Sequence, residues 1–337
     1  MMVHAEGSLP GTDMRSVLQM IAGEAASAFF LPVLPARGLP ATAVGRMTAL
    51  LPDMVWGYGV RTFVCGPQET RFHRAARSLL EQDMDLLEEI VETTGAGSGP
   101  LTVVVAGPVA CLSHVELPNG HWMLTDTGAV CDLMDQYVEM VAQLARDLSR
   151  RTGRDPWVVM DEGDAGPALS GTLPGAHRWE HIPMPDQQIL PAQWSAVGEA
   201  MPGRVVLRLP HESTQWVRQC APALRAGTLR VALPVSLQPS TAQRDEMGEL
   251  LDQWGGGLEC VMPLVVPQRE RRQHAHRLAV LLRDLAVAPQ ESSLPSFHDS
   301  MLCYTSENTH GVSLRGIQEC LGSLVEMPEL VLDEWPQ

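Results

Sequence analysis

Lysine is missing from the sequence, and all 24 basic residues are arginine. Without lysine the chain cannot form a Schiff base through a side-chain amine, and it cannot build a P-loop, whose lysine contacts nucleotide phosphates. The 40 acidic residues outnumber the basic ones and give a net charge of −16. Because a strongly acidic chain repels phosphate backbones, we expect no nucleic-acid partner.

Several other signals are also missing. No run approaches the roughly 18 apolar residues of a membrane span, and the N-terminus lacks the basic region and apolar core of a secretory signal. No glycine-rich dinucleotide or phosphate fingerprint follows any apolar run, so no nucleotide cofactor is expected. Seven cysteines are dispersed without C-x-x-C spacing. An odd, dispersed set indicates reduced thiols, and we therefore expect a cytoplasmic protein that does not contact a membrane.

What the sequence does contain is a regular alternation of apolar runs and amphipathic stretches. With 337 residues, 45% of them hydrophobic, the chain can bury a sizeable core. Short apolar runs typical of strands cover 2–8, 29–34, 101–105, 157–160, 205–209, 229–235, 260–266 and 301–304. Helical patterns cover 13–26, 42–51, 71–93, 129–151, 192–200, 211–225, 241–254, 269–285 and 312–325.

About eight strands, each followed by a helix, predict an α/β fold of the (β/α)8 TIM-barrel class. We expect one barrel domain over 1–337, with a hairpin insertion around 54–66 and an irregular excursion around 163–191. A doubly wound open sheet is the alternative, but it would show fewer repeats and would not need its last strand to pair with its first.

Two adjacent carboxylates, Asp161 and Glu162, follow the apolar run that begins at Trp157. Such a run is typical of a strand buried on both faces of a parallel sheet, whose carboxyl edge is where ligands bind. Carboxylates at this edge suit an ammonium group or proton transfer. The alternative for Glu162 is that it caps the following segment.

Other strand ends supply further candidates for the same edge. Gly7 and Ser8 follow the first predicted strand, and Gly107 follows the third. Glycine at such an end lets a ligand approach the backbone closely. Arg208 lies on the fifth strand, and if it points inward its guanidinium can pair with Asp161, Glu162 or a ligand carboxylate.

Three of these stretches resemble landmarks of the cobalamin-independent methionine synthases: residues 7–12 (GSLPGT), 106–109 (AGPV) and 159–162 (VMDE). The similarity is to the short, single-barrel actinobacterial members and runs through nearly the whole chain in order and spacing. Further matching stretches are Pro35-Ala36-Arg37-Gly38, Gly45-Arg46 and Leu86-Leu87-Glu88.

The resemblance implies a barrel that transfers a methyl group to a thiol such as homocysteine at the carboxyl end of the strands. It implies that Gly7, Ser8 and Asp161, with Glu162 beside it, hold the homocysteine backbone and amino group. Gly163 stands where the family motif has proline. The expected partners are a small thiol or amino acid and a methyl-donor protein, such as a methylated corrinoid protein.

This sequence differs most from the family pattern at the positions of the zinc ligands. The His-x-Cys pair after the fifth strand reads Leu207-Arg208-Leu209, and the late cysteine reads Ser306. Zinc needs about four N, S or O ligands, so by this alignment the chain has no family metal site. A relocated site remains as an alternative, and its candidate ligands are His211, Cys260, Cys303 and His310.

Three functions therefore stay open from the sequence. The first is a methionine-synthase-like methyltransferase with an altered or displaced metal site. The second is a non-catalytic barrel that binds an amino acid or a partner protein after losing the family zinc. The third is a lyase or decarboxylase, since related barrels that bind tetrapyrroles share the architecture, and fold alone does not choose among them.

Overall fold

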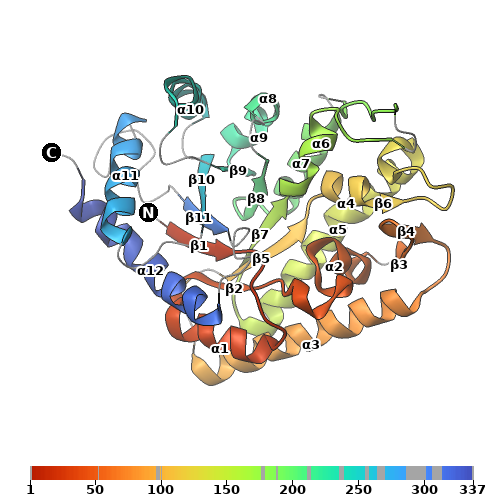
Figure 1. Ribbon diagram of the computed structural model, residues 1–337, viewed down its shortest axis with the longest axis horizontal. Helices are drawn as coiled ribbons and strands as arrows, with labels where there is room; N and C mark the ends of the chain where they lie inside the picture. Colours follow the sequence, from red (N-terminus) through yellow and green to blue (C-terminus); the bar gives the residue numbers. More distant parts are fainter. Residues whose placement is uncertain are drawn as a thin grey trace.

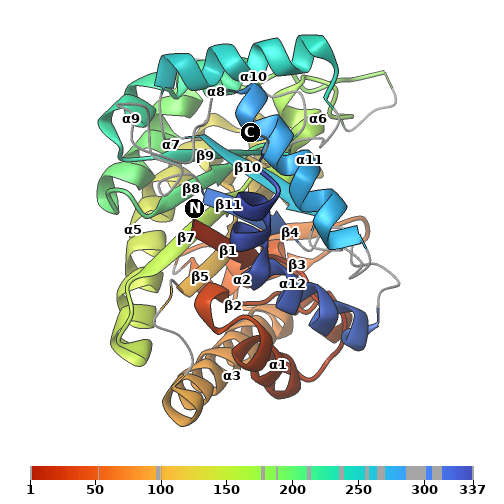
Figure 2. The same ribbon diagram turned by 90° about the vertical axis from the view of Figure 1, so that its left-hand side faces the viewer.

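A parallel sheet lies in the middle of the molecule and the helices surround it (Figure 1, Figure 2). The structure is a computed structural model that describes residues 2–51, 53–95, 99, 101–175, 179–186, 189–210, 214–234, 239–254, 258–263, 270–285, 301–305 and 313–335. Within these residues, eight strands pair in the order β1-β11-β10-β9-β8-β7-β5-β2, and every pair is parallel. The strands are β1 Met2–Glu6, β2 Phe29–Leu31, β5 Leu101–Ala106, β7 Pro156–Asp161, β8 Val205–Arg208, β9 Arg230–Pro234, β10 Leu258–Pro263 and β11 Met301–Thr305.

The two outermost strands of this order, β1 and β2, meet just beyond their ends. Ser8 and Val33 form a parallel bridge, in which Leu9 N donates to Val33 O at 2.8 Å and Val33 N donates to Gly7 O at 3.0 Å. Gly7 has φ 98°, a left-handed conformation that glycine adopts without strain. The turn at Gly7 therefore directs the chain from β1 toward β2.

The helices follow the strands with short connections. They are α1 Met14–Glu24, α2 Ala43–Leu50, α3 Arg71–Thr94, α4 Pro108–His114, α5 Thr127–Thr152, α6 Gly166–Leu169, α7 Ile189–Ala200, α8 Thr214–Gln219, α9 Ala221–Ala226, α10 Thr241–Trp254, α11 Arg271–Asp284 and α12 Leu314–Asp333. Short 3-10 turns cover Ala26–Ala28, Pro35–Arg37, Leu39–Ala41, Met123–Thr125 and Gly163–Ala165. Asp13, Thr42, Thr70, Asp126 and Ser313 each accept a backbone N–H at a helix start, the role for which such side chains are preferred.

A second, three-stranded sheet stands apart from the central one. β3 (Val55–Tyr58) and β4 (Phe63–Gly66) form an antiparallel hairpin, and β4 pairs with β6 (Val115–Glu116). Trp122 joins this sheet to the following excursion, because its Nε1 donates to Pro174 O at 2.8 Å.

The central strands are buried on both faces. Val103, Val158 and Leu207 belong to the main core that packs against the helices. Val104, Val159, Val206 and Ala232 form a separate buried cluster. Because side chains alternate along a strand, this smaller cluster lies on the face turned away from the helices. Near-continuous apolar runs are typical of parallel strands covered on both sides.

Two helices differ from the sequence prediction. The helix expected over 211–225 is two helices, α8 and α9, separated at Cys220. Pro222 explains the break, since its ring would clash with a carbonyl of the preceding turn in a continuous helix. The last helix, expected to end at Val325, continues to Asp333 through Pro328. Burial of Met327 and Val331 offsets the cost of this proline.

The helix α4 and the strand β6 have no counterpart in the prediction. α4 begins at Pro108, directly after its N-cap residue Gly107. Proline suits the first turn of a helix because the N–H it lacks has no intrahelical partner there. The observed fold is thus α/β with a parallel central sheet, as predicted. Among the helices that the structure describes, none combines the length and the apolar character needed to cross a bilayer.

Candidate functional site at the carboxyl end of the sheet

Three neighbouring strands bring most of the predicted site residues to one edge. Ala106 on β5 is in register with Asp161 on β7, and Asp161 is in register with Arg208 on β8. Gly107 and Glu162 follow directly, and Gly107 N donates to Asp161 O at 2.6 Å. Gly107, Asp161, Glu162 and Arg208 therefore lie side by side at the carboxyl end of the sheet.

Asp161 and Arg208 form an ion pair on the inner face of the sheet. They continue the alternation of Val159 and Val206, so they share the face turned away from the helices. Arg208 Nε donates to Asp161 Oδ1 at 2.8 Å, and a second guanidinium nitrogen donates to Asp161 Oδ2. Gly163 N also donates to Asp161 Oδ1, at 2.8 Å. The sequence-based expectation that Arg208 pairs with a strand-end carboxylate agrees with this geometry.

The pair is mostly withdrawn from solvent, but unequally. The side chain of Arg208 is 4% exposed and that of Asp161 is 17% exposed. Fork-like pairing of a guanidinium with a carboxylate fixes both groups and is stronger than a neutral hydrogen bond. The arrangement places a cation and an anion next to each other, with the anion being the more accessible of the two.

Glu162 faces the opposite way, into the helix layer. Its side chain is fully buried and accepts hydrogen bonds from Val109 N at 3.1 Å, Ala110 N at 2.7 Å and Trp194 Nε1 at 2.9 Å. Val109 and Ala110 are in the first turn of α4, whose unpaired N–H groups favour a carboxylate. Glu162 does cap a helix, but the helix follows the neighbouring strand β5.

Burial has the largest effect on the pKa of the Glu162 carboxyl group. It raises the pKa of Glu162 to about 8, while the hydrogen bonds from Ala110, Trp194 and Val109 lower it. The surrounding groups are also withdrawn from water. Burial raises the pKa of the Cys111 thiol and of the Tyr137 phenol, and Tyr137 donates to Ala106 O at 2.8 Å.

The packing of Glu162 against α4 requires glycine at position 107. Its φ of −65° is ordinary, so backbone freedom is not the reason for glycine here. A Cβ at this position would overlap the carboxyl group of Glu162. Gly107, α4 and Glu162 therefore form one packed unit behind the strand ends, closed by Trp194, which stacks edge-on with Trp216 at 5.7 Å between ring centroids.

Gly7 and Ser8 lie after β1, at the bridge to Val33. β1 also lies against β5, the strand that leads to Gly107. The predicted homocysteine-binding role of Gly7, Ser8, Asp161 and Glu162 stays a prediction. Trp194, Tyr137 and the helix α4 were not anticipated, although the Gly-Pro pair after a predicted strand is a helix-start signal that indicates α4.

Of the aligned zinc positions, the three that the structure describes, Leu207, Arg208 and Leu209, do not fit a metal. Leu207 and Leu209 are fully buried and have no donor atoms, and alternation along β8 turns Leu207 toward the helices. Arg208, which does face inward, carries a positive charge that repels a cation. His211, Ser306 and His310 lie outside the described residues.

The relocated zinc site stays a prediction. Cys260 lies on β10 and Cys303 on β11, where Cys260 is opposite Leu302 and Cys303 is opposite Val261. The other two candidate ligands, His211 and His310, are outside the part of the chain that the structure describes.

Comparisons with known proteins bear on the fold. No protein-family model matches the chain, and no curated protein does. Among solved structures, it is similar to a B12-independent methionine synthase from Shewanella sp. W3-18-1 in complex with selenomethionine, with TM-score 0.55 and 12% identity over 98% of both chains. It is also similar to a methyltransferase from Methanosarcina mazei, with TM-score 0.50 and 11% identity over 96% of this chain and 94% of that one. At these identities the likeness shows a related fold and does not assign a family.

Proposed function

We propose that the sheet closes into a (β/α)8 barrel whose carboxyl end binds a small zwitterionic amino acid with a thiol or thioether side chain. The bridge between Ser8 and Val33 supports closure, and so does the fold likeness to a methionine synthase. That synthase structure contains selenomethionine, the selenium analogue of methionine, which is an amino acid of the proposed class.

The observation that carries the ligand class is the ion pair between Asp161 and Arg208. A zwitterion presents an ammonium and a carboxylate about as close together as the two charges of this pair. The ammonium would approach Asp161, the more exposed partner, and the ligand carboxylate would approach Arg208. Both protein charges are held in place before binding, which lowers the ordering cost of association.

Calorimetric titration with L-methionine and with L-homocysteine tests the proposal. We expect saturable binding that weakens at least about tenfold in Asp161→Asn, because a charge-assisted hydrogen bond to the ammonium is lost. Asp164→Asn is the matched control, since Asp164 is exposed and lies three residues further along the chain. It should bind like the original protein.

Asp161→Asn also removes the carboxylate that pairs with the buried Arg208, which destabilises the fold. The double variant Asp161→Asn/Arg208→Gln removes both charges together and keeps the test usable if the single variant unfolds. Binding of neither amino acid, or unchanged affinity in the folded variants, would contradict the proposal.

A second candidate function is methyl transfer to the thiol of homocysteine, favoured by the fold likeness to a methionine synthase and a methyltransferase. That reaction needs a thiolate near neutral pH, which metal coordination supplies in zinc enzymes. The aligned positions in this chain do not provide it, so this function requires the relocated set of His211, Cys260, Cys303 and His310. Elemental analysis finding about one zinc per chain, lost in Cys260→Ser or His211→Ala, would support catalysis. Amino-acid binding without metal would instead support a non-catalytic binding barrel.

A further inference from the structure

A cavity of about 570 Å³ lies at the other end of strands β7 and β8. Its lining includes Pro156, the first residue of β7, and Arg204, which precedes β8, together with one side of α5 and the end of α7. We call it the α5–α7 cavity. The five residue steps from Pro156 to Asp161 separate it from the candidate site by about 16 Å.

The residues that line the α5–α7 cavity include more arginines than carboxylates, unlike the chain as a whole, although Glu139 and Asp147 pair with two of these arginines from α5. Three of its lining residues are arginines, Arg146 and Arg150 on α5 and Arg204 before β8, and Asp155 is the one carboxylate among those that line it. Elsewhere acidic residues dominate a chain of net charge −16. The remaining lining is mainly apolar and includes Ala145 and Met201.

The three guanidinium groups make weak, exposed contacts that a ligand can replace. Their side chains are 43–70% exposed, and isolated ion pairs at that exposure contribute little to stability. Arg204 contacts Asp155 at 2.8 Å, while Arg150 is 3.7 Å from Asp147. Each guanidinium has five N–H donors, more than a single carboxylate can accept.

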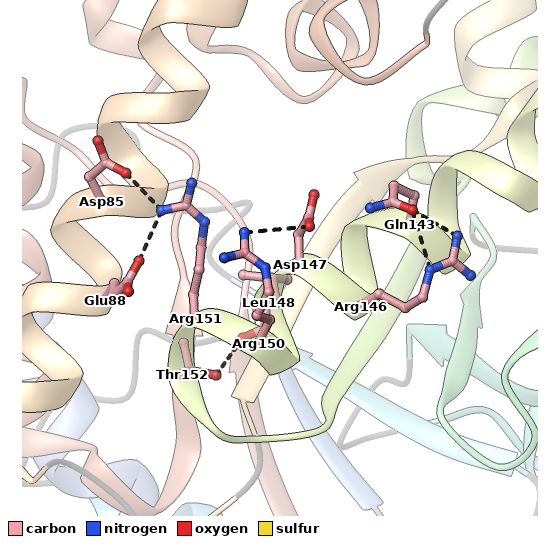
Figure 3. Close-up of polar contacts among 9 residues, drawn as sticks. All are labelled: Asp85, Glu88, Gln143, Arg146, Asp147, Leu148, Arg150, Arg151 and Thr152. Atoms are coloured by element: carbon pink, nitrogen blue, oxygen red, sulfur yellow. Dashed lines mark hydrogen bonds and ion pairs between the residues drawn. The ribbon is translucent and has the colours of Figure 1, made fainter.

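Figure 3 shows that the arginines on α5 have partners on different helices. Arg151 reaches α3, where it contacts Asp85 at 2.7 Å and Glu88 at 3.0 Å, and it does not line the α5–α7 cavity. Arg146 stays on α5 and hydrogen-bonds Gln143 (Figure 3) and Glu139. Arg151 therefore holds two helices together, whereas Arg146 and Arg150 contact residues of their own helix and line the cavity.

We propose that the α5–α7 cavity binds a small organic anion, with a phosphate or sulfonate head between the arginines and an apolar body against the alanine and methionine side chains. The volume falls within the usual range for small-molecule sites. Tetrahedral anions with several oxygens match the donor fork of arginine. The ligand would join α5 to the starts of β7 and β8 without touching the carboxyl end of the sheet.

Titration with 8-anilinonaphthalene-1-sulfonate, followed by fluorescence and calorimetry, tests this inference. Its uncharged relative N-phenyl-1-naphthylamine is the comparison ligand. We expect one saturable site that prefers the sulfonate at least about tenfold, and a loss of at least about tenfold in affinity in Arg146→Gln/Arg204→Gln. Inorganic pyrophosphate should displace the sulfonate.

Arg218→Gln is the matched control, because Arg218 is 51% exposed, pairs with Glu249 and lies outside the cavity. It should bind the sulfonate like the original protein, and so should Asp161→Asn/Arg208→Gln, which separates this inference from the proposed function. Circular dichroism confirms that each variant is folded. Equal affinity for the uncharged ligand, no saturable binding, or an unchanged affinity in the double arginine variant would overturn the proposal.

Discussion

At the scale of single residues, the adjacent carboxylates of Asp161 and Glu162 point to opposite faces of the sheet at the end of β7. Asp161 turns inward to Arg208, whereas Glu162 turns outward to the first turn of α4 and to Trp194. The two-residue period of a strand causes this division. The structure gives Glu162 buried hydrogen-bond partners in α4 and Trp194, and the ligand-binding role of both acids stays a prediction.

Glu162→Gln should remove a pH dependence of stability. Burial raises the pKa of Glu162 to about 8, well above the usual value of 4.5, so between these pH values the folded chain retains a proton that the unfolded chain has released. More protons bound in the folded state means that stability falls as pH rises through this window. Urea unfolding at pH 5 and pH 8 should therefore show a larger loss in the original protein than in the variant. Parallel losses would mean that the hydrogen bonds keep Glu162 ionised.

His73 should give a pH dependence of stability of the opposite sign, with stability lost as pH falls. It is buried, its Nδ1 lies 3.0 Å from Thr48 Oγ1, and Trp56 N donates to the same hydroxyl. Burial lowers the pKa of His73; Glu69 opposes this shift, and Arg77 and Arg74 add to it.

The unfolded chain therefore binds the extra proton first, and stability is lost as pH falls below about 6.5. His73→Gln should lose less stability than the original protein between pH 7 and pH 5.5, in urea unfolding. The exposed His121→Gln is the control, and it should follow the original protein. An identical loss in His73→Gln would contradict a neutral buried imidazole.

At the scale of elements, the helix α4 is stabilised by Glu162, a residue that is distant in the sequence and follows the neighbouring strand β7. Gly107 starts the helix, and Glu162, 55 positions later, binds its first turn. Local signals explain why a helix can begin at Pro108, but the partner for its N–H groups comes from β7. The small helix and the strand end therefore stabilise each other.

Gly107→Ala tests this unit. The added Cβ would overlap the carboxyl group of Glu162, and forcing an extra carbon into such a packed site costs about 1–3 kcal/mol of unfolding free energy. Gly23→Ala in α1 is the matched control, since no atom lies within 4 Å of its added Cβ. It should stabilise the protein by about 0.4–1 kcal/mol in the same denaturant titration. A neutral effect at Gly107 would show that Glu162 can move away.

At the scale of the whole molecule, β1 and β2 are the outermost strands of the sheet order, and their free edges either pair with each other or stay open. An open parallel sheet leaves two edges with unpaired backbone groups, whereas a barrel leaves none. The bridge between Ser8 and Val33 supplies two hydrogen bonds at this place. If the sheet closes, the edges of β1 and β2 are protected from water.

Native-state hydrogen exchange measures that protection. We expect the amides of Leu9 and Val33 to exchange as slowly as those of Val103 and Val104 in the interior strand β5, because opening either requires unfolding of the sheet. The amide of Tyr58, a residue of the hairpin that is 52% exposed, serves as the fast reference. Exchange of Leu9 and Val33 at the rate of Tyr58 would contradict barrel closure.

Much of this architecture follows from local patterns in the sequence. The apolar runs locate the strands of the central sheet, and Asp13 and Thr42 cap the helices they precede. The hairpin of Val55–Tyr58 and Phe63–Gly66 lies where a hairpin is expected, around 54–66. What local patterns miss is decided by distant partners. α12 runs past Pro328 because Met327 and Val331 in its last turns are buried, and α4 is held by Glu162.

The sequence by itself determined the period of each element, and therefore that acids and an arginine reach the carboxyl edge of a parallel sheet. Only the tertiary structure decided which face each of them occupies and which partner it meets. Register between strands set the pairing of Asp161 with Arg208, and packing of α4 and Trp194 set the hydrogen-bond partners of Glu162. These outcomes depend on atoms far apart in the chain, whose contacts a local pattern does not encode.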